Sequence, residues 1–162
     1  MEQPHRLHYK KAAKRLYGLR LLKRNALPAD VLLSVYCTYI RSIVEYSCES
    51  WHFNLPLYLS DQIENVQKRA LRIIFPAMKY IDAMSRAKLT TLHERRSVLC
   101  NRFFSNMISP SHKLNGSVRP KKLFTYSLRS HAALLEPKCR TERFSNSFVP
   151  AATCAYNIIK KS

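Results

Sequence analysis

The sequence predicts a mainly α-helical protein, with a small helical bundle over residues 10–108 and an irregular basic tail over residues 109–162. Through the first part, apolar residues recur at intervals of three and four, which is the spacing of a helix that buries one face. Helix-capping signals and prolines mark the ends of these segments. Near residue 110 prolines, a glycine and polar residues gather in "SPSHKLNGSVRPKK", which indicates a loop or linker.

The first predicted helix spans Tyr9 to Arg24, "YKKAAKRLYGLRLLKR", and ends at Asn25. Lysines and arginines surround one inner face, which is the pattern of a basic amphipathic helix. The expected members of the inner face are Ala13, Leu16, Tyr17 and Arg20.

The second predicted helix begins at Pro28, with Asp30 in the first turn, where a negative charge suits the helix dipole. Two apolar rows run along it. One row holds Val31, Val35, Tyr39 and Ile43, and the row beside it holds Leu32, Tyr36 and Ile40. Together they form a face wide enough to be buried on most sides.

The third predicted helix lies in "LSDQIENVQKRALRIIFP", residues 59–76. Asp61 and Glu64 have the spacing of a capping box, and Pro76 prevents continuation. The apolar stripe consists of Ile63, Val66, Ala70 and Ile74. Three basic residues of the second half lie off that stripe, namely Lys68, Arg69 and Arg72.

A short helix over residues 80–86 and a longer one after Thr91 complete the predicted bundle. Thr91 and Glu94 form a second expected capping box. The helix that follows can bury Leu92, Leu99, Phe103 and Met107 together. In the tail, "LFTYSLRSH" predicts a short strand or extended segment, "EPKCRTERFSNSFVP" an irregular stretch, and "AATCAYNII" a short closing helix.

The charge balance indicates an anionic partner. Twenty-eight Lys and Arg against ten Asp and Glu give a net charge of +18, which favours nucleic acid. Five cysteines without a close pair fit a reducing compartment. The N-terminus lacks the apolar core of a signal peptide, and the longest apolar run is interrupted by Arg41. We expect an intracellular protein outside the membrane, with nucleus and cytoplasm both open.

Signals for catalysis and for cofactors are absent from the sequence. No two acidic residues are adjacent, whereas two-metal chemistry needs gathered carboxylates, and Glu45 has Arg41 as a plain i,i+4 partner. There is no CxxC pair for zinc, no phosphate-cradling loop and no nucleophile elbow. We therefore expect no catalytic centre, metal or cofactor.

Basic segments mixed with aromatic residues are the strongest functional signal, since cations displace counterions from phosphates and rings stack on unpaired bases. In the tail, Tyr126 is a further expected contact. Most other aromatic residues are expected in the core, namely Tyr36, Tyr39, Tyr46, Phe75, Phe103 and Phe104. The predicted nucleic-acid contacts are Lys10, Lys11, Lys14, Arg15, Lys68, Arg69, Arg72, Arg95, Arg96, Lys121, Lys122, Arg129, His131, Arg140 and Arg143.

A series of motifs resembles the C-terminal region of reverse transcriptases from non-LTR retrotransposons of the LINE and jockey type. The series is "KAAKRLYGLRLLKRN", "YIRSIVEYSCESWH", "LSDQIENVQKRALRIIFP", "LTTLHERRSVL", "YSLRSH" and "PKCRTERFSNSFVPAATCAYN", over about residues 10 to 157. The resemblance implies a thumb, which is a small helical bundle that contacts the template–primer duplex, and the segment after it. Matching positions include Arg41, Glu45, Tyr46, Trp51, Gln67, His93, Glu94, Ser130, Thr141, Phe144 and Asn146, besides basic residues already named.

The chain departs from that family in its chemistry. The palm with its catalytic aspartate pair, the endonuclease and the Cys/His knuckle of some members have no counterpart in these residues. The resemblance therefore implies binding of RNA, DNA or their hybrid without polymerase activity. Three alternatives stay open: a part of an enzyme that works when a palm is supplied in trans, a helical protein-interaction module with no nucleic-acid role, and a remnant whose exposed apolar surface makes it aggregate.

Overall fold

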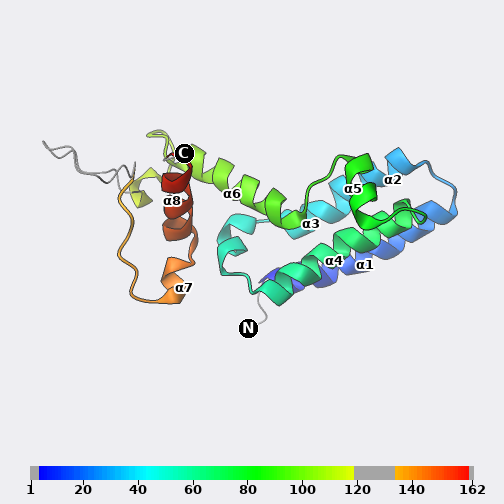
Figure 1. Cartoon of the computed structure of the whole chain (residues 1–162), viewed down its shortest axis with the longest axis horizontal. Helices are drawn as coiled ribbons and strands as arrows, with labels where there is room; N and C mark the ends of the chain where they lie inside the picture. The colour runs from blue at the N-terminus through cyan, green and yellow to red at the C-terminus, as the bar shows by residue number, and fades with distance from the viewer. Residues whose placement is uncertain (1–3, 119–133, 161–162) are drawn as a thin grey trace, which may run out of the picture. The chain divides into compact units, whose positions relative to one another are not determined.

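The computed structural model describes residues 4–118 and 134–160, with side chains from residue 9 onward (Figure 1). These residues are mainly helical, which confirms the predicted fold class. The chain forms two compact units: unit 1 is residues 1–48 and 55–96, and unit 2 is residues 49–54 and 97–162. The sequence predicted a boundary between bundle and tail after residue 108. In the structure, helix α6 (Leu92–Met107) begins in unit 1 and ends in unit 2.

Unit 1 is a bundle built around two long helices. Its elements are α1 (Pro4–Arg24), α2 (Ala29–Val35), the π-helical turn η1 (Tyr36–Arg41), α3 (Ser42–Glu45), α4 (Leu57–Ile74), α5 (Tyr80–Ala87) and the start of α6. Helix α1 packs along α4 and also contacts η1 and α3, while α5 packs on α4 (Figure 1). At the C-terminal ends, Lys23 Nζ donates to the carbonyl of Ile74 at 3.2 Å. A cation there compensates the unpaired carbonyls of α4.

The buried face of α1 differs from the predicted one. Ala12, Leu16 and Leu19 are buried, whereas Tyr17 is 66% exposed and Arg20 is exposed. The prediction of Tyr17 and Arg20 on the inner face is therefore wrong. Spacing of i, i+4 and i+7 places the three small or aliphatic residues on one stripe and leaves the tyrosine and the arginine in solvent.

The second predicted helix is continuous but contains a π turn. Of its two apolar rows, the one with Tyr36 and Ile40 is buried, while Tyr39 in the other row is exposed. Three hydroxyls on the solvent side each donate to the carbonyl four residues earlier, from Ser34, Thr38 and Ser42. Such back-bonding competes with the main-chain ladder, which gives a local reason for the widened turn.

Helix α4 begins earlier than the sequence predicted. Its N-cap is Pro56, so Asp61 lies in the second turn and the predicted capping box of Asp61 and Glu64 is wrong. Glu64 instead caps another helix, because its Oε2 accepts from the main-chain N–H of Leu92 at 2.9 Å. The predicted stripe is confirmed, since Ile63, Val66, Ala70 and Ile74 are all buried.

The second capping box is confirmed at the start of α6. Thr91 Oγ1 accepts from the N–H of Glu94 at 3.2 Å, and Glu94 Oε2 accepts from the N–H of Thr91 at 3.3 Å. Farther along α6, Phe104 and Met107 are buried, while Phe103 is partly exposed.

A buried polar network centred on Gln67 joins the helices of unit 1. Its Oε1 accepts from Tyr36 Oη at 2.7 Å, and its Nε2 donates to the carbonyl of Thr90 at 2.9 Å and to Tyr80 Oη at 3.1 Å. Tyr80 Oη donates in turn to Glu64. Each polar group of the Gln67 amide is thus paired in a site that water does not reach.

Two helices of unit 1 end on residues with a left-handed backbone. Ala26 has φ 59° and Lys88 has φ 52°. In both cases the next residue bonds back to the carbonyl five positions earlier, from Leu27 to Leu22 and from Leu89 to Met84. This is the Schellman ending, which usually has glycine at the left-handed position.

Unit 2 contains the end of α6, α7 (Glu142–Ser145) and α8 (Phe148–Ile159), with 3₁₀ turns at His52–Asn54 and Asn115–Ser117. Its core consists of Phe104, Met107, Val118, Leu134 and Ala152. The predicted closing helix is confirmed as the end of α8, which begins at Phe148 rather than Ala151. The irregular prediction for residues 136–150 is wrong where α7 forms, because Thr141 Oγ1 accepts from the N–H of Phe144 and caps that turn.

Asn157 of α8 is hydrogen-bonded to the main chain of Leu134. Its Oδ1 accepts from the main-chain N–H of Leu134 and its Nδ2 donates to the main-chain carbonyl, each at 3.0 Å. Nδ2 also donates to Glu136 Oε1 at 3.0 Å. The predicted extended segment "LFTYSLRSH" lies outside the described residues. Among the helices that are described, none is long and apolar enough to cross a membrane.

Candidate nucleic-acid interface

Helix α1 presents the densest predicted basic segment to solvent. Lys10, Lys11 and Lys14 are exposed, and Arg15 is half-buried. Helical periodicity places them on a different face of α1 from the buried stripe of Ala12, Leu16 and Leu19. The lysines are therefore placed as the sequence predicted, on the outer side of a helix whose other side is fixed in the bundle.

Arg15 is held in one orientation by a tyrosine of η1. Its Nη1 donates to the carbonyl of Tyr39 at 2.7 Å, and its guanidinium carbon lies 3.8 Å from the centroid of the Tyr39 ring. A guanidinium has five N–H donors, so this contact leaves others for an oxyanion. A cation fixed over an aromatic ring loses less conformational freedom when it binds a phosphate.

An open hollow adjoins this cation. Lys11 and Arg15 from α1 line it on one side, and Ser42, Ile43 and Tyr46 line it on the other, with a volume of about 360 Å³. Tyr46 is 69% exposed. Tyr46 directly follows α3, and Ser47 after it has φ 51°, so the backbone turns through the left-handed region immediately after Tyr46.

The predicted basic residues of α4 form a second exposed group. Lys68, Arg69 and Arg72 are all exposed and lie off the buried stripe, as predicted. Lys68 Nζ lies 5.6 Å from the centroid of the Tyr80 ring, close enough for a cation–π contact. This group belongs to the helix that packs along α1.

Two predicted contacts on α6 make contacts inside the protein. Arg96 is fully buried and donates from Nη2 to Ser60 Oγ at 3.0 Å, so the prediction that it binds phosphate is wrong. Arg95 is half-buried, and its Nε lies 3.4 Å from Glu45 Oε1, which also pairs with Arg41 at 3.2 Å. The predicted Arg41–Glu45 pair is confirmed, and the pairing compensates part of the Arg95 charge.

Unit 2 places two further predicted residues at its surface. Arg140 and Arg143, on either side of the capping Thr141, are exposed. Four predicted contacts, together with Tyr126, lie outside the described residues; the four are Lys121, Lys122, Arg129 and His131.

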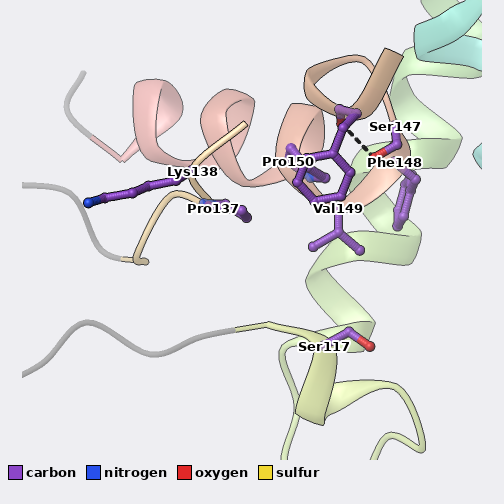
Figure 2. A pocket seen from close by; sticks show the side chains of 8 residues that line it. Ser117, Pro137, Lys138, Ser147, Phe148, Val149 and Pro150 are labelled. Atoms are coloured by element: carbon purple, nitrogen blue, oxygen red, sulfur yellow. Dashed lines mark hydrogen bonds between the residues drawn. The ribbon is translucent and has the colours of Figure 1, made fainter. Parts of the chain in front are cut away.

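A hollow in unit 2 is mainly apolar. Figure 2 shows Phe148, Val149 and Pro150 at the start of α8, with Pro137 on the segment that precedes α7, around a hollow of about 510 Å³. Ser147 Oγ donates to the carbonyl of Phe144 at 2.7 Å, drawn as the dashed line in Figure 2, and fixes the turn between the two helices. Among the described residues that line it, Lys138 is the one cation, so this lining is less basic than the surface of α1.

Metal-ligating groups do not gather in the part of the chain that the structure describes. No set of three His, Cys, Asp or Glu side chains is close enough to hold an ion there. All five cysteines lie in the described ranges, none of them in a disulfide bond. Burial raises the pKa of the Cys37 thiol, which favours the protonated form rather than a nucleophile.

Sequence reasoning missed Tyr39 and Tyr46 as surface residues, because both were expected in the core. Tyr36 and Phe104 are buried as predicted, but Tyr39 and Tyr46 are exposed. Whether a tyrosine of the second helix is buried depends on which of the two apolar rows of that helix faces the core. The row of Leu32, Tyr36 and Ile40 is buried, and this leaves Tyr39 on the solvent side.

Comparison with protein-family models, with curated proteins and with solved structures finds no match.

Proposed function

We propose that this chain binds nucleic acid through unit 1, with α1 and α4 supplying phosphate contacts. The observation that carries the proposal is the exposed row of Lys10, Lys11 and Lys14 beside the oriented Arg15. Phosphate binding releases condensed counterions, so a fixed row of cations gains affinity without any sequence-specific contact. The net charge of +18 adds long-range attraction for a polyanion.

The family resemblance makes this proposal more specific. We propose that the chain corresponds to the thumb and post-thumb region of a non-LTR reverse transcriptase, with RNA, DNA or their hybrid as ligand. A thumb binds the duplex while the palm performs the chemistry, and the palm's aspartate pair has no counterpart in these 162 residues. The proposed activity is therefore binding without catalysis, and a palm domain supplied in trans is the proposed protein partner.

The salt dependence of binding tests the proposal. Fluorescence anisotropy of the full chain with a labelled DNA duplex, and with an RNA–DNA hybrid of the same sequence, gives the affinity at several salt concentrations. We expect affinity to fall steeply with salt. In the double variant Lys11→Ala/Lys14→Ala, the slope of log affinity against log salt should decrease in magnitude by about 1.8, since each lost phosphate contact to duplex DNA contributes about 0.9.

A matched control removes the same charge elsewhere. Lys113 and Lys138 are exposed lysines of unit 2. The double variant Lys113→Ala/Lys138→Ala should leave the slope nearly unchanged. Affinity that does not change between low and moderate salt, or equal slopes for the two double variants, would contradict the proposal.

Exposed apolar side chains favour a second candidate function. Leu57 at the start of α4 is 78% exposed and Ile81 of α5 is 71% exposed. Such residues occur at protein interfaces, or make a remnant aggregate. Light scattering on the wild type and on Leu57→Ser/Ile81→Ser separates this candidate: a wild-type chain that stays monomeric at high concentration would count against it.

A further inference from the structure

We propose that the hollow between α1 and α3 takes one unpaired nucleotide, with its base on Tyr46 and its phosphate on Lys11 and Arg15. This inference rests on the proposed function and adds a ligand class to it. Phosphate contacts alone do not distinguish a duplex from a strand end, whereas a stacking ring beside two cations does.

The size of the hollow fits a single small ligand. A volume of about 360 Å³ lies near the lower end of the range for small-molecule pockets. The hollow is open to solvent, and Lys11, Ser42 and Tyr46 of its lining are exposed. A nucleotide at the end of a strand can therefore enter while the remaining strand continues across the surface of α1.

The two cations of the hollow differ in how firmly their side chains are held, and therefore in how each would bind a phosphate. Arg15 is fixed by its bond to the Tyr39 carbonyl and by its position over the Tyr39 ring. Its planar guanidinium matches the geometry of two phosphate oxygens. Lys11, one turn earlier on α1, is exposed and reaches the same phosphate as a flexible point charge.

Tyr46 is the proposed stacking residue because it is the tyrosine in the lining of the hollow and most of its side chain is exposed. Tyr39 does not line the hollow, and one face of its ring is covered by Arg15, at 3.8 Å from its centroid. Tyr46 lines the hollow itself and is 69% exposed. Stacking of a base on such a ring is insensitive to base identity, so the hollow should accept any of the bases.

The ligand must be unpaired because of the geometry of a duplex. Inside a helix both faces of a base are covered by neighbouring base pairs, and the terminal pair of a blunt end, which has one open face, is about twice as wide as the single base that a hollow of about 360 Å³ would take. A single-stranded overhang offers such a face. The inference therefore predicts a preference for overhangs over blunt ends, in addition to the salt-dependent affinity for both.

The test compares two labelled probes at one fixed salt concentration: a blunt RNA–DNA duplex, and the same duplex with a single-stranded extension of a few nucleotides. We expect the wild type to bind the extended probe about tenfold more tightly, which is the effect of one base stacked on a ring. Tyr46→Ala should lose this preference while its affinity for the blunt probe stays the same. Tyr46→Phe should keep the preference, since the ring is retained.

Two controls make the outcomes distinct. Tyr17→Ala removes a tyrosine of α1 that is 66% exposed and does not line the hollow, and should retain the preference. A 2-aminopurine at the end of the extension should be quenched by the wild type and by Tyr46→Phe, but not by Tyr46→Ala. Circular dichroism of each variant confirms that the helices are intact.

Three results would overturn the inference. Equal binding of the two probes by the wild type would do so while leaving the proposed function in place, as long as both affinities fall steeply with salt. Equal loss of affinity for both probes in Tyr46→Ala would show that the ring acts on the duplex or on the fold. Absence of binding to either probe would remove the proposed function together with this inference.

Discussion

Each of the two units has a buried side-chain amide that pairs polar groups of its core, and the residues around the two amides differ. In unit 1, the amide of Gln67 joins Tyr36, Tyr80 and the Thr90 carbonyl between helices that also share a long aliphatic stripe. In unit 2, the amide of Asn157 bonds both main-chain groups of Leu134. An amide suits both places because it donates and accepts at once.

The apolar cores of the two units differ in the kind of side chain that they bury. Unit 1 buries aliphatic residues along the length of α1 and α4, so that many side chains share the stabilisation. The helices α7 and α8 of unit 2 are shorter than α1 and α4, and the rings of unit 2 meet edge to face around Phe104, with centroids 6.1 Å from Phe148 and 5.8 Å from Tyr156. A small core that rests on a few aromatic contacts loses a larger share of its stability with each residue removed.

The largest expected effect is in the aromatic core of unit 2. Phe104→Ala should lower the free energy of unfolding of unit 2 by about 4 kcal/mol, through lost burial and the cavity left behind. Trp51 is the sole tryptophan, it belongs to unit 2 and it is buried, so its fluorescence during urea unfolding serves as the probe of that unit. Phe144→Ala, at a half-exposed ring, is the control and should change little. Equal shifts of Trp51 fluorescence and far-UV circular dichroism would mean that the two units unfold together, and the comparison would fail.

Removal of the Asn157 amide should lower the free energy of unfolding of unit 2 somewhat less than Phe104→Ala does. Asn157→Ala leaves the N–H and carbonyl of buried Leu134 without their partner, which should lower the stability of unit 2 by about 3 kcal/mol. The Trp51 transition in urea measures it. Asn106→Ala, at an exposed position of α6, is the matched control. A loss no larger than that of the control would show that Leu134 is held by packing alone.

The corresponding change in unit 1 should be smaller. Gln67→Leu is of similar size and leaves the Tyr36 hydroxyl and the Thr90 carbonyl unpaired, for a loss of about 2 kcal/mol. The aliphatic stripe around it is unchanged, which limits the effect. Urea unfolding followed by far-UV circular dichroism measures the loss, with the exposed Gln62→Leu as control. A loss larger than that of Asn157→Ala would reverse the comparison between the units.

Alkaline pH should also weaken unit 1. Burial raises the pKa of Tyr36, and burial followed by the hydrogen bond to Glu64 raises the pKa of Tyr80. The unfolded chain releases these protons near pH 10 while the folded chain retains them, so stability is complete below pH 10 and falls above it. Each such group contributes a decrease of up to about 1.4 kcal/mol per pH unit. Thermal unfolding from pH 9 to 11 should show a shallower decrease in Tyr36→Phe, and identical decreases would contradict the assignment.

The smallest expected effect is a gain. Ala26 and Lys88 have left-handed backbones at the ends of α1 and α5. Glycine adopts this conformation without the steric cost that a Cβ imposes, so Ala26→Gly and Lys88→Gly should each stabilise unit 1 by about 0.5 to 1 kcal/mol. Thermal denaturation measures the gain. Ala77→Gly at an exposed turn is the control, and a gain of the same size there would show that the left-handed backbone is not its cause.

Local signals in the sequence predicted most of the helices. The capping box of Thr91 and Glu94 and the stripe through Ile63 and Ile74 depend on residues within a few positions of one another, and both are confirmed. The capping box at Asp61 was wrong for the opposite reason. Glu64 has its partner at Leu92, which is distant in sequence and becomes a neighbour only after α4 and α6 pack.

The sequence by itself determined that the chain is helical and basic, and that the cations of α1 and α4 lie off the apolar stripes, because helical periodicity assigns residues to faces. Only the tertiary structure decided which of two competing rows faces the core. That choice buries Tyr36 and exposes Tyr39. It also decided that Arg96 is enclosed while Tyr46 lines a hollow with Arg15, because burial depends on which helix packs on which face, and no local pattern contains that information.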